Sequence, residues 1–329
     1  MWTTINFELC GTGHKKEGIP CQDKTYSASD NGVIVSALAD GAGSAVFSHF
    51  GAETAVRSVC EYLTNNFLEM YNSDGVSAKQ KIVDFLVGQL TQKAREMNCR
   101  LKDLASTLLA VAIYQNECII IHIGDGIIGC LRNGNVQILS YPNNGEFSNS
   151  TYFVTTDNVV KYIEIKKGSV NRISGFVLMS DGTSESFYNK REKMFSDGVI
   201  KIMQHSILLN DITALEVIKN NFDLVLENTL DDCSIAMVIR KSKELRTYSE
   251  LSHDEKIRIL GCKTKYRLLK KKQKKIDAII KIIESGEHNI DIICKRIKSN
   301  KSFVNQHILS YLRSSGIISG TNEIYLNLR

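Results

Sequence analysis

The sequence has 329 residues, of which 43% are hydrophobic and 23% charged; this composition is typical of globular proteins and excludes disordered and fibrous chains. At roughly 100–200 residues per domain, the length allows two domains. No apolar stretch approaches the roughly 20 residues that cross a bilayer, and the first residues lack the pattern of a signal peptide. The nine cysteines show no Cys-x-x-Cys spacing, which argues against disulfides and zinc. We therefore expect a soluble, cytoplasmic protein with reduced thiols.

Charged residues are unevenly distributed along the chain. Residues 1–240 contain 21 Lys and Arg against 27 Asp and Glu, whereas residues 241–329 contain 20 against 9. The net charge is therefore −6 in the first part and +11 in the second. This asymmetry predicts two parts with different partners, and for the second part it predicts an anionic polymer or an acidic protein surface.

The first elements in chain order are a short apolar run and two amphipathic stretches. Residues 32–39 form an almost continuous apolar run that ends in Asp-Gly-Ala-Gly, the pattern of a buried strand followed by a tight turn. A helix is predicted next, because apolar residues recur at spacings of three and four from Ala52 to Leu63. A second helix is predicted over residues 77–102.

Four short apolar runs follow, separated by turn residues, which predicts an antiparallel meander. They cover residues 106–114, 118–123, 127–131 and 136–139. Further strands are predicted at 176–179 and 233–239, with helical patterns around 197–227 between them. Because strands and helices come in blocks and do not alternate one for one, the pattern favours an α+β fold.

Aspartates stand at the ends of these apolar strands. Asp40 and Asp181 follow strands, Asp125 lies in a Gly-Asp-Gly turn, Asp231 precedes the last strand, and Asp23 precedes another expected strand. A single Asp beside a Gly is usually a turn residue, but a carboxylate at the end of a core strand is costly unless it is solvated, capped or bound to a cation. Several converging carboxylates without His or Cys favour Mg²⁺ or Mn²⁺ and disfavour zinc.

Other chemistries lack their motifs. The turn that begins at Asp40 fails the dinucleotide pattern Gly-x-Gly-x-x-Gly, because Val46 occupies the third glycine position. The chain also has no phosphate-binding Gly-x-x-x-x-Gly-Lys-Ser/Thr loop, no Gly-x-Ser-x-Gly elbow and no His-Glu-x-x-His. The seven histidines, His122 included, are interpreted as packed or surface residues.

Six short motifs follow one another along the chain: Pro-Cys-Gln-Asp (20–23), Ala-Asp-Gly-Ala-Gly (39–43), Ser-Thr-Leu (106–108), Gly-Asp-Gly (124–126), Ser-Asp-Gly (180–182) and Asp-Asp-Cys-Ser (231–234). Their order resembles that of the metal-dependent protein phosphatases of type 2C, most of all the compact bacterial members. The resemblance covers residues 1–240. It implies a four-layer αββα sandwich, in which two antiparallel sheets pack face to face with helices outside.

The resemblance also implies a site for two Mn²⁺ or Mg²⁺ ions and a third, weaker one. Asp40 would bridge two ions, and Asp125 would hold the third. The residues that the resemblance implies at the metals are Asp23, Asp40, Gly41 through its carbonyl, Asp125, Asp181 and Asp231. Asp40, Asp181 and Asp231 are also the implied catalytic residues. A metal-bridging water would then hydrolyse phosphoserine or phosphothreonine esters in proteins without a covalent enzyme intermediate.

Three positions differ from the family pattern. Gln22 stands where many relatives have glutamate, and it offers the second ion only an amide carbonyl. The usual phosphate-binding arginine is missing, and the nearby cationic candidates are His14, Lys15 and Lys16, which also fit a solvated basic loop. Ser44 replaces the second glycine of the common Gly-x-Gly-Gly turn. A second hypothesis is therefore a weak or inactive phosphatase-fold regulator that binds a phosphoprotein and, through its basic part, DNA or a protein.

The last part of the chain combines a basic run with apolar stripes. Residues 263–275 contain eight Lys and Arg and no acid, so residues 241–275 are predicted to be a basic linker or helix. Three helical stripes and a hairpin pattern follow. Residues 276–329 therefore resemble a winged-helix domain, with Ser302–Arg313 as the recognition helix.

The partner of this domain stays open between nucleic acid and protein. For nucleic acid, phosphate contacts are predicted for Lys270, Lys271, Lys272 and Lys301, and base contacts for Asn305 and Gln306. Basic charge supplies affinity without sequence preference. For the first domain we expect a phosphoprotein substrate and an opposing kinase.

Overall fold

Two units make up the chain in the computed structural model. One unit comprises Trp2–Ile200 with Phe222–Arg240, and the other comprises Met1, Lys201–Asn221 and Lys241–Arg329. The structure describes residues 1–133, 135–143, 151–208, 229–241, 266–309 and 323–326, and single residues or pairs between 215 and 225 and between 312 and 319. The domain boundaries at residues 240 and 275 stay a prediction. Among the described helices, none combines the length and hydrophobicity of a transmembrane span.

Two five-stranded antiparallel sheets form the centre of the first unit. The sheet that we call the β3 sheet has the order β2-β3-β4-β5-β8, and the β9 sheet has the order β1-β12-β9-β6-β7. The strands of the β3 sheet are Lys24–Asp30, Val33–Ala39, Leu108–Tyr114, Glu117–Ile123 and Glu164–Ser169, in that order. Those of the β9 sheet are Trp2–Leu9, Cys233–Arg240, Ile173–Met179, Ile127–Arg132 and Asn135–Ser140.

The predicted meander is wrong at its middle link. β4 pairs with β5, and β6 pairs with β7, but β6 lies in the other sheet, where its second partner is β9. The chain crosses between the sheets at the Gly-Asp-Gly turn, where Gly124 has a φ of +110°. This backbone conformation is easily adopted only by glycine, and it directs the chain out of the β3 sheet.

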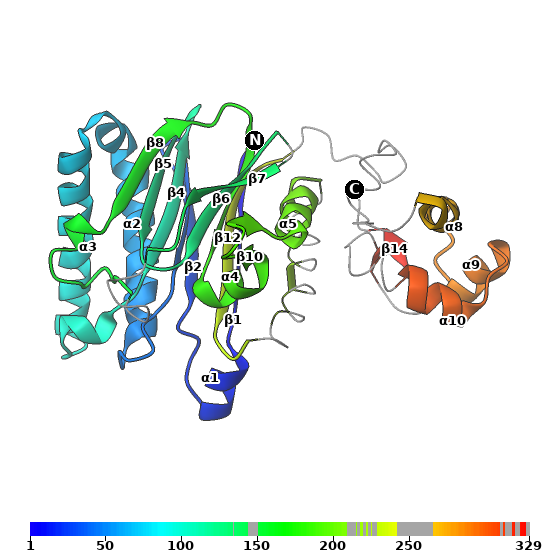
Figure 1. Cartoon of the computed structure of the whole chain (residues 1–329), viewed down its shortest axis with the longest axis horizontal. Coiled ribbons are helices and arrows are strands. Elements are labelled where there is room, and N and C mark those ends of the chain that lie inside the picture. Colours follow the sequence, from blue (N-terminus) through cyan, green and yellow to red (C-terminus); the bar gives the residue numbers. More distant parts are fainter. Residues whose placement is uncertain are drawn as a thin grey trace. The chain divides into compact units, whose positions relative to one another are not determined.

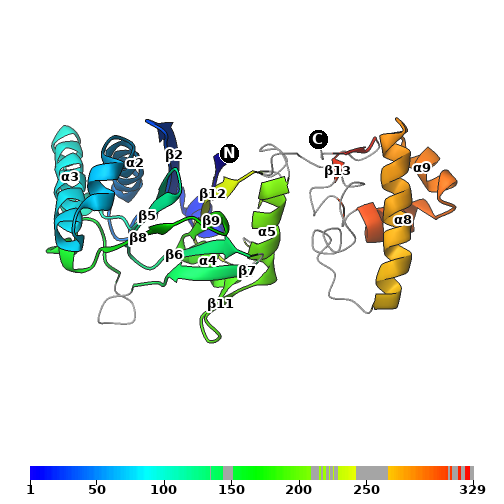
Figure 2. The same ribbon diagram turned by 90° about the horizontal axis from the view of Figure 1, so that it is seen from above.

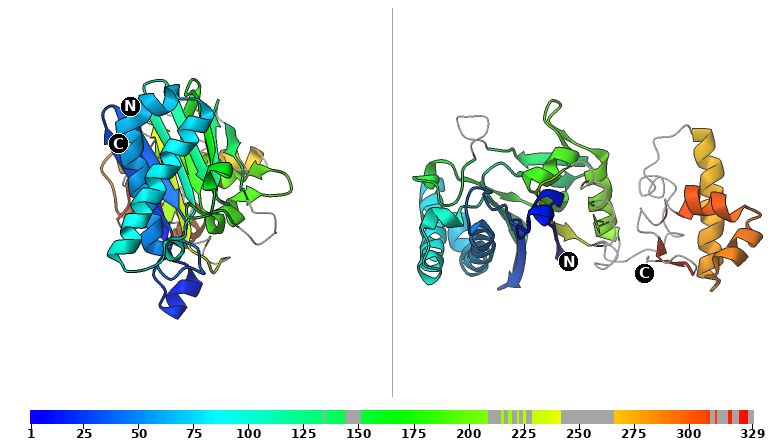
Figure 3. Two further views of the ribbon diagram at one scale, coloured as in Figure 1. Left: turned by 90° about the vertical axis from the view of Figure 1, so that its left-hand side faces the viewer. Right: turned by 90° about the horizontal axis from the view of Figure 1, so that it is seen from below.

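Two long helices cover the outer face of the β3 sheet (Figure 1; Figure 3, left). They are α2 (Ser48–Asn72) and α3 (Gly75–Glu96), and the stripe from Ala52 to Leu63 faces the sheet. Asp74 caps α3 by accepting hydrogen bonds from the backbone N–H groups of Val76 and Ser77. The helix ends before the predicted residue 102, because Asn98 takes a left-handed φ of +52°.

The two sheets pack on each other through a core that includes Leu38, Leu109, Phe176 and Val238. On the far side of the β9 sheet, α4 (Asp181–Phe187) lies against β12 (Figure 2). These layers confirm the predicted four-layer αββα sandwich. The remaining elements of this part are α1 (Thr12–Glu17), the 3-10 turns η1 (Leu101–Leu104) and η2 (Val159–Lys161), β10 (Tyr188–Asn189) and β11 (Met194–Phe195). The helix α5 (Asp197–Leu208) begins in this unit, and its residues from Lys201 are assigned to the other.

In the second unit, the described residues form short helices and a strand pair. The elements are α8 (Tyr266–Glu284), α9 (Ile290–Arg296), α10 (Lys301–Val304) with the π turn η4 (Asn305–Leu309), and the antiparallel strands β13 (Ile318–Ser319) and β14 (Tyr325–Leu326). Residues from all three predicted apolar stripes share one core, including Ile279, Ile293 and Ile308. The comparison with a winged-helix domain stays a prediction.

Candidate metal centre

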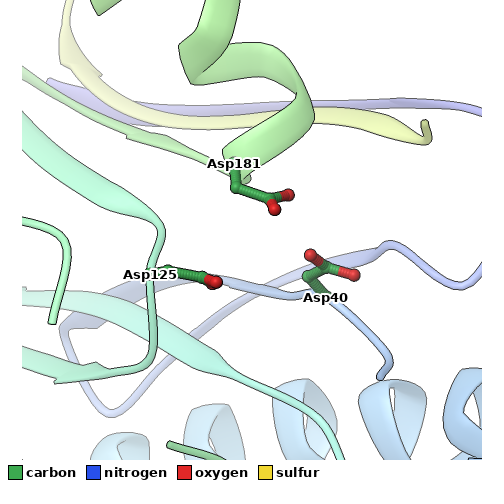
Figure 4. A group of neighbouring side chains, drawn as sticks. All are labelled: Asp40, Asp125 and Asp181. Carbon is green, nitrogen blue, oxygen red and sulfur yellow. The ribbon is translucent and has the colours of Figure 1, made fainter. Parts of the chain in front are cut away.

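Three carboxylates from distant parts of the sequence meet at one end of the sandwich. Asp40 follows β3, Asp125 lies in the crossing between β5 and β6, and Asp181 is the first residue of α4. Each offers one oxygen, and these oxygens all lie within 4.8 Å of one another. Figure 4 shows the three groups facing a common space. Such a donor set, made only of oxygen atoms, suits a hard divalent cation.

Electrostatic repulsion in this cluster also fits a cation. Burial raises the pKa of Asp40 well above its usual range, and the charges of Asp23 and Asp181 raise it further. Burial, assisted by the charge of Asp125, raises the pKa of Asp181 to about 6. A bound divalent ion would reverse these effects, because opposite charge favours the ionised carboxylate.

A cavity of about 280 Å³ opens over the cluster. Its lining comprises His14, Gln22, Asp40, Gly41, Ala42, Gly43, Thr107, Asp125, Thr151, Phe153, Asp181 and Asp231. The predicted residues Gln22, Gly41 and Asp231 therefore share one cavity with the three clustered carboxylates. A larger groove of about 1000 Å³, between α3 and residues 154–161, contains none of the predicted site residues.

Asp23 is a predicted site residue that does not line this cavity. The residue is 1% exposed, and burial raises its pKa to about 7, although hydrogen bonds with Ser234 and Ser180 lower it. Because ionising a buried carboxylate is costly, Asp23 is a further sign that this end of the sandwich is built for a cation.

The backbone around Asp40 is held on both sides. The Asp40 N–H donates to Thr107 Oγ1 over 2.9 Å, and the Thr107 N–H donates to the Asp40 carbonyl over 2.8 Å. Gly41 follows, and a Cβ at its position would lie 2.8 Å from the Cβ of Ser48. Close packing therefore requires glycine at position 41, and the two hydrogen bonds with Thr107 fix the backbone from which the Asp40 side chain extends.

Asp232 is a site residue that the sequence analysis missed. Its carboxylate accepts hydrogen bonds of 2.6 Å from the backbone N–H groups of Gly11 and Gln22 and lies 3.0 Å from His14 Nδ1. Burial alone would raise the pKa of Asp232, but the two backbone hydrogen bonds and His14 lower it. The Asp231-Asp232 doublet was its only signal, because its partners lie more than two hundred residues away in the sequence.

The three cationic candidates near the first motif differ in position. His14 lines the cavity, whereas Lys15 and Lys16 are exposed on α1 and do not. Asp232 holds the imidazole of His14 by its Nδ1. The structure thus shows that His14 lines the cavity and the two lysines do not, a difference that the sequence alone did not reveal.

Asp125 has two supports that the sequence did not reveal. Thr151 donates a short hydrogen bond from Oγ1 to the Asp125 carboxylate. His122, 2% exposed on β5, has Nε2 at 2.9 Å from the Gly124 carbonyl and Nδ1 at 2.6 Å from Ser140 Oγ. His122 is a packed residue, as expected. The sequence signal for its contact with the turn was that His122 is a single polar residue within an apolar run.

The predicted nucleic-acid contacts are only partly described. The side chains of Lys270, Lys271 and Lys272 lie outside the described residues. Lys301 is paired with Asp291 at 2.7 Å, Asn305 is half-buried, and Gln306 is exposed.

Comparisons with known proteins agree with this geometry. The family model described as protein phosphatase 2C matches residues 10–214. Serine/threonine-protein phosphatase 3 of Escherichia coli (strain K12) is 25% identical over 184 residues, which cover 53% of this chain and 72% of that protein.

Solved structures share the fold. The Mycobacterium tuberculosis serine/threonine phosphatase PstP/Ppp matches with a TM-score of 0.51 and 16% identity, over 73% of this chain and 99% of that one. The Staphylococcus aureus phosphatase Stp1 matches with a TM-score of 0.50 and 14% identity, over 74% and 96%. Because the family model spans more than half of the residues, the chain belongs to the protein phosphatase 2C family.

Proposed function

We propose that this chain, which its family makes a metal-dependent protein-serine/threonine phosphatase, holds its Mn²⁺ or Mg²⁺ ions with the carboxylates of the cavity. The convergence of Asp40, Asp125 and Asp181 within 4.8 Å carries this assignment. Asp231 and the Gly41 carbonyl complete it from the same cavity lining, and the buried Asp23 supports the cluster. A structure of the PstP catalytic domain contains two manganese ions, which supports a site for more than one ion here.

The lining of the cavity favours direct attack by water on the phosphate ester. When bound, divalent cations neutralise phosphoryl oxygens and lower the pKa of water. Among the described residues of the lining none is cysteine or serine, and the two threonine hydroxyls already form hydrogen bonds, Thr107 with the Asp40 backbone and Thr151 with Asp125. These described residues therefore offer no evident nucleophile for a covalent enzyme intermediate.

We assign the role of the missing arginine to His14. Asp232 lies 3.0 Å from Nδ1 of the imidazole. When the ring is protonated both nitrogens carry a hydrogen, so Nε2 can then donate to a phosphoryl oxygen while Nδ1 faces Asp232. Lys15 and Lys16 are exposed outside the cavity and fit a solvated basic turn.

The experiment that tests this function compares hydrolysis of an aryl phosphate and of phosphoserine and phosphothreonine peptides with and without Mn²⁺. We expect turnover that requires the metal and is abolished by a chelator. Equal turnover in chelator would contradict the assignment. Metal-dependent binding of the phosphopeptides without any hydrolysis would instead establish the second hypothesis, an inactive phosphoprotein-binding regulator.

For the second unit we propose an anionic partner, with duplex DNA as the first candidate. The support is the net charge of +11 in residues 241–329. Ile292 and Phe303, which are 41% and 47% exposed on α9 and α10, are the features that fit a protein partner instead. The phosphoprotein substrate of the first unit also implies an opposing kinase.

A further inference from the structure

A short hairpin, β10 and β11, directly follows α4. Its tip reads Lys190-Arg191-Glu192-Lys193, and no other window of four residues in the first 240 contains three Lys or Arg. This part of the chain has a net charge of −6. The densest cationic cluster of an acidic phosphatase unit is therefore concentrated at one hairpin tip.

The hairpin is anchored, so that its tip has a defined position. Tyr188 pairs with Phe195 across the two strands, and their ring centroids are 6.0 Å apart. Phe195 packs so closely on β6 that a Cβ at Gly129 would lie 2.5 Å from its ring. Asn189 Oδ1 accepts hydrogen bonds of 3.0 Å from the backbone N–H groups of Arg191 and Glu192. These contacts fix the backbone from which the cationic side chains extend.

Two exposed apolar side chains lie beside the cations. Met194 is 61% exposed and Tyr141 is 49% exposed. Lys193 Nζ lies 5.9 Å from the centre of the Tyr141 ring. In the described part of the chain, Lys190, Arg191 and Lys193 form no ion pair with a carboxylate. Exposed Tyr, Met and Arg side chains in one patch are typical of protein interfaces.

The patch lies within reach of the metal centre. α4 begins with the metal-site residue Asp181 and ends one residue before Tyr188 (Figure 1). At about 1.5 Å per residue, this helix separates Asp181 from Tyr188 by about 10 Å, and the two residues from Tyr188 to Lys190 add at most about 7 Å. An extended peptide covers about 17 Å with about five residues. A segment close to a phosphorylated residue can therefore contact the patch while its phosphate lies over the carboxylates.

We propose that Tyr141 and the β10–β11 hairpin form a docking surface for an acidic segment of the phosphoprotein substrate that also carries a large apolar residue. Carboxylates of the segment pair with Lys190, Arg191 and Lys193, and the apolar residue packs on Met194 and Tyr141. This inference rests on the proposed phosphatase function and specifies its substrate class. The alternative occupant, a general polyanion, is an outcome of the test.

The test compares two phosphopeptides that differ only in their flanks. One has Asp and Glu with one Leu within five residues of the phosphoserine, and the other has Gln and Ser at the same positions. The variant is the triple charge reversal K190E/R191E/K193E in the full chain. Its matched control, K79E/R95E/K102E on α3 and η1, changes the net charge by the same amount away from the patch.

We expect the hairpin variant to raise the KM for the acidic peptide about tenfold, with aryl phosphate hydrolysis unchanged and the control variant like the wild type. M194S and Y141S should each raise the same KM, and added salt should weaken the effect of the charge reversal. An unchanged KM, or an equal rise for both peptides, would overturn the proposal. Heparin serves as the competing polyanion. If the hairpin variant keeps the preference for the acidic peptide, and heparin removes this preference in both the variant and the wild type, the site is a general polyanion site. That result would overturn the proposal as well.

Failure of the phosphatase function itself is separated by a binding measurement. If the wild type hydrolyses neither peptide with Mn²⁺, the proposed function fails. Fluorescence anisotropy of the labelled acidic peptide then decides on the docking surface alone. Weaker binding by the hairpin variant than by the control variant would support the surface, and equal binding would reject it.

Discussion

Asp40 combines a rigid backbone with a carboxylate that is repelled by its neighbours. Thr107 binds its N–H and carbonyl groups, while burial, and after it the charges of Asp23 and Asp181, raise its pKa. We expect D40N and D181N to lower metal-dependent hydrolysis at least about a hundredfold, because each removes a charged ligand at the reacting phosphate. Steady-state kinetics with saturating Mn²⁺ measures this loss, and circular dichroism should show that both variants fold. Retained activity in a folded D40N protein would contradict its role as the bridging ligand.

Burial of these carboxylates, together with their mutual repulsion, predicts how the metal-free protein responds to pH. The pKa values of Asp23 and Asp181 are raised to about 7 and about 6, so the folded state holds more protons than the unfolded state above pH 4. Stability of the metal-free protein should therefore fall as pH rises from about 4 to 7. Thermal unfolding in chelator should show a midpoint that falls by several degrees over this range, and D40N should reduce the fall. Saturating Mn²⁺ should remove this fall in the unfolding midpoint. A midpoint that rises with pH in chelator would contradict the raised pKa values of the carboxylates.

Gln22 offers a test of metal affinity at a single position. It lines the cavity, and its backbone is fixed because its N–H donates to Asp232 and its carbonyl accepts from the Gly41 N–H. Q22E adds a charged oxygen at this place, so we expect several-fold tighter Mn²⁺ binding in calorimetric titration. Q92E, on the exposed face of α3, is the matched control. Superimposed titrations of Q22E and wild type would mean that residue 22 does not contact an ion.

Among single residues, the sequence predicted the candidate site residues that lie in short, ordered motifs. It missed residues whose role depends on contacts with distant parts of the chain. Asp40, Asp125 and Asp181 were identified before their proximity was known. Asp232 and Thr151 were not, because each acts through a partner 26 or more residues away. His14 could not be separated from the adjacent lysines, since only the fold determines which side chain enters the cavity.

Among the elements, the crossing from β5 to β6 connects packing with the metal centre. His122 contacts the Gly124 carbonyl and Ser140, so H122A removes two buried hydrogen bonds, although the Gly124 carbonyl still accepts from the Asn143 N–H and Ser140 still donates to Glu164. We expect a loss of about 2 kcal/mol in the free energy of unfolding. We also expect weaker binding of the third Mn²⁺ ion, because Asp125 directly follows Gly124. Urea denaturation and calorimetry measure the two effects. C118A, on the same face of β5, should destabilise the protein without changing metal binding; equal metal binding by H122A would show that the contact is only structural.

Periodicity predicted the type of most elements but not their connections or ends. The strands at 106–114 and 118–123 are confirmed as β4 and β5, yet the meander was wrong, because a Gly-Asp-Gly sequence can form either a hairpin or a crossing between sheets. Similarly, apolar spacing continued past α3, whereas the helix ended at a left-handed asparagine. Both outcomes depend on packing that a local pattern does not contain.

For the whole molecule, the charge asymmetry predicts salt-dependent binding by the second unit. Residues 263–275 contain eight Lys and Arg, so the full chain should bind random duplex DNA at low salt and weaken steeply toward physiological salt. K270E/K271E/K272E should reduce both the affinity and the slope with salt, whereas K79E/R95E/K102E should not. Fluorescence anisotropy measures binding, and absence of binding by the wild type at low salt would leave a protein as the partner.

The order of strands has a consequence for synthesis of the protein. β1 pairs along its whole length with β12, from Trp2 with Arg240 to Leu9 with Cys233, and Asp232 binds the backbone at Gly11 and Gln22. The first strand to leave the ribosome, β1, therefore cannot pair until β12, one of the last strands of its unit, has been synthesised. At about 5–20 residues per second, this delay is about 10 to 50 s. Until then the cavity lacks Asp231 and the contact of Asp232 with His14. With the proposed metal ligands, we therefore expect a nascent chain to have no phosphatase activity before its own sheet closes.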